Sequence, residues 1–138
     1  MSIHSPWDAA RHLGVTVIRT PLNHARGYTD GCGRIWVDPR QTYVQQSCTL
    51  AHELMHVIHG HVGRQPEHVE EEIRRATARW LVPWHRLLEA IGDQLHLHDV
   101  AETLSVTPEV LEDRLTHATP RELARLERHP SCDTYSPA

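Results

Sequence analysis

Apolar positions in the first forty residues follow the short period that is typical of β-strands. Val15–Thr20 is a β-branched run, and a second run, Arg34–Val37, follows a glycine-rich turn at 29–33. Because this turn joins the second run to residues near Arg26–Tyr28, a hairpin is expected. Ahead of the strands, the apolar spacing over Pro6–Leu13 predicts a short helix.

From residue 41 onward the apolar positions recur every three to four residues, which is the period of a helix that faces a core. Three helices are expected here, over Gln41–His59, Glu67–Leu81 and Trp84–Ile91, with Gly60, Pro83 and Gly92 as their stops. Shorter helices should begin at three capping signals, which are Asp99 with Glu102, Thr119 with Glu122, and Thr107-Pro108.

These elements predict an α+β fold with a small N-terminal antiparallel-type sheet packed on the helix at 41–59 and a helical C-terminal half. A chain of 138 residues has the length of one domain. We expect a single domain over 1–130, made of a catalytic part over 1–92 and a helical part over 93–130. Residues 131–138 should form a tail.

Composition narrows the choice of partner and compartment. The formal net charge is −4 with neutral histidines, so neither a nucleic acid nor an anionic membrane is expected as a partner. No apolar run approaches the roughly 20 residues that cross a bilayer. Three widely spaced cysteines, without an N-terminal secretion signal, favour a reducing cytoplasm. We therefore expect a soluble cytoplasmic protein that acts on another protein.

The segment TLAHELMHVIHGH, residues 49–61, carries the candidate chemistry. His52, Glu53 and His56 form an H-E-x-x-H motif, and on a helix both imidazoles lie on one face and can reach one metal ion. Glu53 lies about 100° round the helix, where it can activate a water molecule beside the ion. Zn²⁺ suits such a site, and Mn²⁺ is the alternative. Because the chain has 13 histidines, the motif can also arise by chance, and a third ligand is needed to support it.

Two histidines that follow the motif do not supply this ligand. The metzincin pattern needs a glycine and a histidine at positions that His59 and Val62 occupy here, so that pattern is excluded. His59 lies about 10 Å along the helix from His52, too far to share one ion with the motif. We interpret His59 and His61 as solvent-facing or supporting groups.

Three glutamates on the next expected helix are the remaining candidates: Glu70, Glu71 and Glu72. Helical spacing predicts a buried stripe formed by Val69, Ile73, Ala76 and Trp80. Glu71 falls on the opposite, solvent-facing side, whereas Glu70 and Glu72 both flank the stripe and periodicity does not separate them. The alternative is that all three form a solvated acidic run that stabilises the helix N-terminus.

The segments RIWVD, TLAHELMH and EIRRATARWLVP resemble the ImmA/IrrE family of gluzincin-like metallopeptidases, and the resemblance covers residues 10–116. In that family a glutamate eleven residues before the proline is the third metal ligand, and counting back from Pro83 leads to Glu72. The resemblance therefore implies that His52, His56 and Glu72 bind the metal. Three residues depart from the family pattern without changing this position, namely Ile73, Ala76 and Trp80.

Members of this family cleave helix-turn-helix transcriptional repressors and so release genes of mobile elements or stress responses. The resemblance implies a zinc-dependent endopeptidase whose substrate is a repressor encoded nearby, with Glu53 as the general base. The alternative is a metal-binding antirepressor that inhibits its partner without cutting it.

The resemblance to gluzincins also suggests residues that would bind the substrate. A peptide would pair with an edge strand formed by Arg34, Ile35, Trp36 and Val37, although an edge strand that binds nothing is the alternative. The oxyanion of the tetrahedral intermediate would be stabilised by a tyrosine or histidine, for which the candidates are Tyr28, Tyr43 and His85.

Residues 99–115 have the length of a helix-turn-helix, which raises DNA binding as a rival function. The second helix of this segment carries Glu109, Glu112 and Asp113, and these carboxylates oppose binding to a phosphate backbone. A packing or substrate-docking role is therefore favoured. Of the cysteines, Cys48 is expected in the core and Cys32 as an exposed thiol in a turn.

Overall fold

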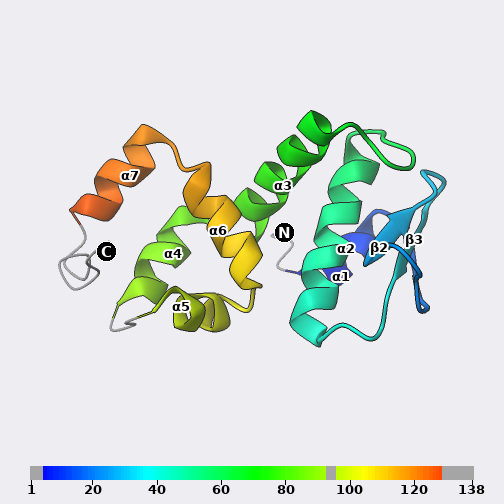
Figure 1. Cartoon of the computed structure of the whole chain (residues 1–138), viewed down its shortest axis with the longest axis horizontal. Helices are drawn as coiled ribbons and strands as arrows, with labels where there is room; N and C mark the ends of the chain where they lie inside the picture. Colours follow the sequence, from blue (N-terminus) through cyan, green and yellow to red (C-terminus); the bar gives the residue numbers. More distant parts are fainter. Residues whose placement is uncertain (1–4, 93–95, 129–138) are drawn as a thin grey trace. The chain divides into compact units, whose positions relative to one another are not determined.

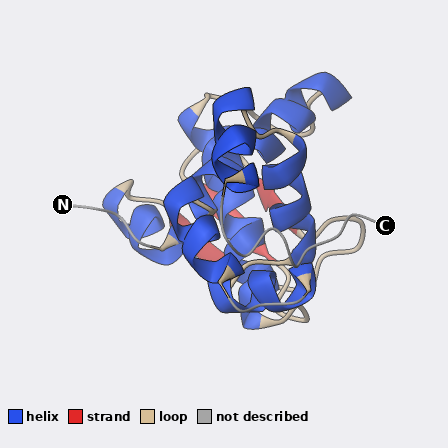
Figure 2. Cartoon of the chain, turned by 90° about the vertical axis from the view of Figure 1, so that its left-hand side faces the viewer, coloured by secondary structure: helices blue, strands red, loops and turns tan. Residues whose placement is uncertain are grey.

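The computed structural model describes residues 5–92 and 96–128, and within them the chain forms one small sheet and seven helices (Figure 1). The strands are β1 (Thr16–Arg19), β2 (Gly27–Thr29) and β3 (Arg34–Val37). The helices are α1 (Pro6–His12), α2 (Tyr43–Ile58), α3 (Glu67–Leu81), α4 (Trp84–Ile91), α5 (Leu97–Leu104), α6 (Pro108–Thr116) and α7 (Pro120–Glu127). Helix predominates over strand (Figure 2), and the expected α+β class is confirmed.

The sheet has the strand order β1-β3-β2. The predicted hairpin is confirmed, since β2 pairs with β3 in antiparallel orientation. The sheet is nevertheless mixed, because β1 pairs with the other side of β3 in parallel orientation, with Thr16 opposite Arg34 and Arg19 opposite Val37.

The expectation that Arg34, Ile35, Trp36 and Val37 form an edge strand is therefore wrong. β3 has a partner on each side, so its backbone groups are already used in two ladders. Ile35 and Val37 alternate along it as fully buried residues, each 0% exposed, which is what a central strand requires. Within the described residues, the free edges belong to β1 and β2.

Helix α2 packs against β2, β3 and α1, and its apolar face forms the core with the sheet. Leu50, Ala51 and Leu54 are 0% exposed. The helix begins with a capping box, in which Thr42 accepts a hydrogen bond from the Gln45 backbone and the Gln45 side chain accepts one from Thr42. This cap and the sheet contacts hold the rotation of α2 about its axis, and hence the direction of the side chains that leave it.

The connection from β3 to α2 is fastened by Asp38. Its carboxylate accepts hydrogen bonds from the Leu22 backbone and from the backbone and guanidinium of Arg40. The hydrogen bonds from Arg40 hold the pKa of this carboxyl well below its usual range. The chain is thus pinned just before the helix that carries the H-E-x-x-H motif.

The chain divides into two compact units, with the boundary between Thr77 and Ala78 inside α3. In the second unit, Val82, Leu87, Val100 and Leu111 form the core, each at most 1% exposed. The predicted single domain over 1–130 stays a prediction, and the predicted tail at 131–138 lies outside the described residues. No helix in the described part of the chain is long and apolar enough to cross a bilayer.

The short C-terminal helices test the three predicted capping signals. Thr107 and Thr119 cap α6 and α7 as expected, and the box between Thr119 and Glu122 is complete. The predicted box at Asp99 is wrong, because α5 begins two residues earlier at Leu97. Asp99 consequently lies in the first turn of α5, where its charge favours the helix dipole without capping the helix.

Candidate metal centre

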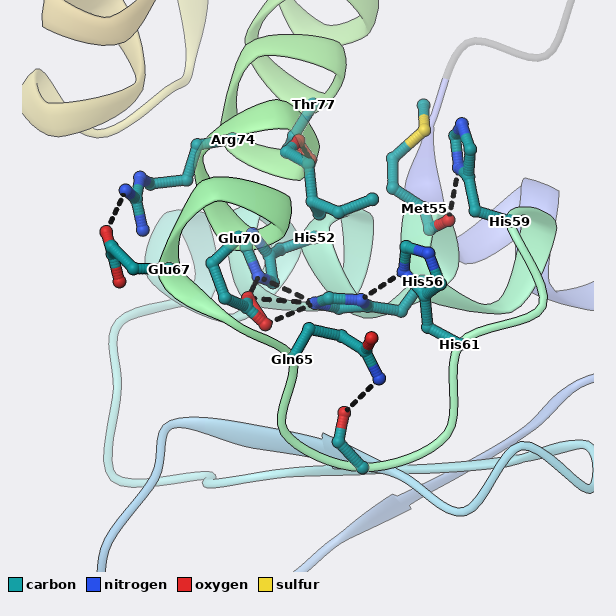
Figure 3. Close-up of polar contacts among 12 residues, drawn as sticks. His52, Met55, His56, His59, His61, Gln65, Glu67, Glu70, Arg74 and Thr77 are labelled. Carbon is teal, nitrogen blue, oxygen red and sulfur yellow. Dashed lines mark hydrogen bonds and ion pairs between the residues drawn. The ribbon is translucent and has the colours of Figure 1, made fainter.

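Helix α2 places the two histidines of the motif one turn apart on the same face. The Nε2 atoms of His52 and His56 are 3.2 Å apart, and both rings point toward α3 (Figure 3). His56 is 3% exposed. Burial lowers the pKa of both imidazoles. The neutral form, which has a lone pair available for a metal, is therefore favoured.

The carboxylate of Glu70, on the first turn of α3, completes this group. Its Oε2 atom lies 3.3 Å from His52 Nε2 and 3.1 Å from His56 Nε2. Within the described residues these three side chains form the group whose ligand atoms converge closely enough to hold a metal ion (Figure 3). A four-coordinate zinc ion with bonds of roughly 2.1 Å separates its ligand atoms by roughly 3.4 Å. The donor types and their spacing therefore fit such an ion.

Glu72, which the family resemblance implies as third ligand, is not in this group. Taking about 100° per residue, Glu70 lies about 60° round α3 from Ile73, on the same side of Ile73 as Thr77. Glu72 lies about 100° from Ile73 on the opposite side. Ile73 is 2% exposed and Thr77 is 3% exposed, so the buried face of α3 includes Glu70 and leaves Glu72 exposed. The expectation is corrected from Glu72 to Glu70.

The buried face of α3 is turned toward Thr77 for a reason that hydropathy does not reveal. The Thr77 hydroxyl donates a hydrogen bond to the backbone carbonyl of Ile73, at 2.7 Å, and so can be buried without an unsatisfied polar group. Ala76 and Trp80, which the predicted stripe included, are only partly buried. Because its hydroxyl is hydrogen-bonded within the helix, Thr77 packs as a core residue.

Glu53 lies beside the convergent group, one residue after His52. Burial raises the pKa of its carboxyl to about 7, and the negative charge of Glu70 acts in the same direction. A carboxyl group with a pKa near 7 can both accept and release a proton at neutral pH. The position and the pKa of Glu53 are suited to acid-base chemistry next to the histidines.

A pocket of about 600 Å³ opens onto these side chains. Its walls come from α2, from the β2 edge at 27–29, from the loop at 63–65 and from the first turns of α3. At Gly27 β2 lies close to α2, since a Cβ added there would lie 2.5 Å from Thr49 Cγ2 and 3.2 Å from Glu53 Cγ. A larger residue at this position would force either β2 or the Thr49 side chain to shift.

A family model described as the IrrE N-terminal-like domain, Peptidase M78, matches residues 10–116. The chain belongs to the Peptidase M78 family. Membership implies peptidase activity, and the expected resemblance to the ImmA/IrrE family is confirmed over the same residues. The search of curated proteins and the search of solved structures found no match.

Within this M78 domain, the three candidates for oxyanion stabilisation lie in different places. Tyr28 lines the pocket, with its ring tilted against Trp36 and 47% of its surface exposed. Tyr43 instead stacks on Trp7 at the start of α2, about 13 Å along the helix from His52. His85 is exposed on α4 in the second unit. The assignment of this role stays a prediction.

The two histidines after the motif, for which the sequence predicts the same role, differ in the M78 domain. The Nδ1 atom of His61 lies 3.1 Å from Nδ1 of His56. His59 instead bonds through its Nδ1 to the backbone carbonyl of Met55, at 2.8 Å. A glycine at the helix end followed directly by a histidine is the sequence signal that could have distinguished His61.

The expected burial of Cys48 and exposure of Cys32 are confirmed.

Proposed function

We propose that this M78 domain is a zinc-dependent endopeptidase in which His52, His56 and Glu70 hold the ion and Glu53 is the general base. The observation that supports it is the convergence of three ligand atoms beside the partly buried carboxyl group of Glu53, in one pocket of a chain from a peptidase family. When bound, a zinc ion would polarise the scissile carbonyl and acidify the attacking water. Mn²⁺ is the alternative ion.

Glu53 would accept the proton of the attacking water and deliver it to the amine that leaves when the peptide bond breaks. Its raised pKa suits both steps, because a carboxyl group whose pKa lies near the pH of the solution gains and loses a proton readily. Glu53→Gln keeps the shape of the side chain and removes the basic oxygen. This variant should bind zinc and fail to cleave.

The substrate would lie along β2, in place of the strand at Arg34–Val37 that the sequence suggested. β2 pairs with β3 on one side, and its residues 27–29 line the pocket. An extended peptide could add to the free side of β2 through backbone hydrogen bonds, and its scissile bond would then pass Glu53. Tyr28, in the middle of β2, is the candidate nearest to a bound carbonyl on this account.

As the substrate we propose a helix-turn-helix repressor encoded near this gene, in a phage, a mobile element or a stress-response locus. The support is the resemblance to repressor-cleaving relatives, together with a formal net charge of −4 that suits a basic DNA-binding partner. Cleavage in the cytoplasm would relieve repression.

The direct test is to incubate the zinc-loaded protein with the repressor from the neighbouring gene and to identify fragments by mass spectrometry. We expect cleavage at a defined bond, and no cleavage by Glu53→Gln at equal zinc content. A stoichiometric complex of the two proteins without fragments, at every zinc or manganese loading, would refute the proposed protease activity. It would support a metal-binding antirepressor that does not cleave its partner.

The ligand set has a separate test with a matched control on the same helix. Glu70→Ala removes the carboxylate that faces both histidines, whereas Glu72→Ala removes one that is exposed two residues away. We expect zinc retention after dialysis to fall sharply in Glu70→Ala and to stay at the wild-type level in Glu72→Ala. The reverse order would restore Glu72 as the third ligand.

A further inference from the structure

We propose that His61 is a positioning residue for His56, holding its imidazole in the tautomer and orientation that bind the metal. The proposal rests on the metal site proposed above and adds a group that supports it from behind. The observation is a hydrogen bond between the two imidazoles on the side of His56 that faces away from Glu70 (Figure 3).

The way α2 ends places His61 over His56. The helix stops at Ile58, and Gly60 adopts a φ of +74°, a conformation that glycine reaches without strain. The Gly60 N–H donates to the Val57 carbonyl at 3.1 Å, and the His61 N–H donates to the His56 carbonyl at 2.9 Å. These two bonds are those of a Schellman motif.

In a Schellman motif the residue after the glycine is brought back against the residue three positions before the helix cap, usually in an apolar contact. Here these two residues are His61 and His56, and their ring centroids lie 5.3 Å apart. An imidazole pair thus occupies the place of the apolar pair. The turn that terminates the helix also brings a hydrogen-bonding group to the back of a proposed ligand.

Chemistry assigns the proton in this contact. His56 Nε2 faces Glu70 and His52, so it must be unprotonated to offer a lone pair to a metal. The proton of neutral His56 then lies on Nδ1 and is donated to Nδ1 of His61, 3.1 Å away. A ligand histidine whose other N–H has a fixed acceptor keeps its tautomer and ring orientation, which strengthens metal binding.

His59 provides a control from the same turn. It is exposed, and its Nδ1 is engaged with the Met55 carbonyl at 2.8 Å instead of with a ligand. Its ring stacks on His61 with centroids 5.9 Å apart. Removing it therefore perturbs the surroundings of His61 without removing a hydrogen bond to His56.

The experiment compares the zinc dissociation constants of four variants of the full chain with that of wild type, by competition with a chromophoric chelator. His61→Ala and His61→Phe both lose the acceptor, and Phe keeps the ring volume; we expect each to weaken zinc binding about 10- to 100-fold. His61→Asn, whose amide oxygen can accept near the position of Nδ1, should recover most of this loss. His59→Ala should stay within a few-fold of wild type.

The outcomes separate this proposal from the proposed function. Wild-type zinc affinity in a folded His61→Phe protein, or equal losses in the Phe and Asn variants, would overturn the positioning role and leave the metal site standing. A wild-type protein that binds no zinc would overturn both. Circular dichroism of each metal-free variant checks folding, and the Phe variant serves if His61→Ala unfolds.

Discussion

The partly buried carboxyl of Glu53 should make the metal-free protein less stable as the pH rises. Burial, followed by the charge of Glu70, raises the Glu53 pKa from its ordinary value of 4.5 to about 7. Between these two pH values the folded protein keeps a proton that the unfolded chain has released. Stability therefore falls by up to about 1.4 kcal/mol per pH unit, which amounts to about 3 kcal/mol in all.

Replacing Glu53 by glutamine removes this penalty, because the amide stays neutral at every pH. Glu53→Gln should be more stable than wild type by about 3 kcal/mol at pH 8, and by about 1 kcal/mol at pH 5.5. The assay is urea unfolding of both proteins, free of metal, at each pH. Comparing the two proteins at the same pH cancels most of the contribution of the other titrating groups.

A stability difference that is equal at the two pH values would refute this reasoning, since it would mean that Glu53 ionises alike in the folded and unfolded protein. A larger difference at pH 5.5 would reverse the sign and show a depressed pKa. The expected result has a functional side as well: the more stable variant should be the inactive one, because the group that destabilises the fold is the proposed base.

Two further predictions concern packing and a buried ion pair. Gly27→Ala should destabilise the protein by about 1–3 kcal/mol in urea unfolding, because the new methyl would lie 2.5 Å from Thr49 Cγ2. Adding Thr49→Ser removes that methyl group and should recover most of the lost stability. A double variant as unstable as Gly27→Ala would contradict the clash. Arg114→Met removes the guanidinium that pairs with Glu122 at 2.5 Å and should cost about 3 kcal/mol. Arg79→Met, which removes a more exposed pairing with the same carboxylate at 3.7 Å, should cost under about 1 kcal/mol; equal losses would contradict the distinction.

Features that depend on neighbouring residues could be predicted from the sequence. The bounds of α3 and α4 agree with the predicted ranges, because apolar period, a following proline and a glycine stop act within a few residues. His52, Glu53 and His56 come from one helix, so their spacing alone determines their relative directions. The sequence places the start of α5 at Asp99, because aspartate is a favoured N-cap residue. The helix instead begins two residues earlier, at Leu97.

Features that depend on distant residues were decided by the tertiary structure. β3 is central and not an edge because β1, separated from it by β2 in sequence, pairs with its other side. Glu70 faces the histidines because α3 buries Thr77, a residue whose polarity is hidden by a hydrogen bond to its own helix. The sequence by itself determined the relative positions of two histidines and a glutamate, His52, His56 and Glu53, on one helix. Which glutamate from the next helix joins them depended on how that helix is rotated when it packs, and only the assembled core sets that angle.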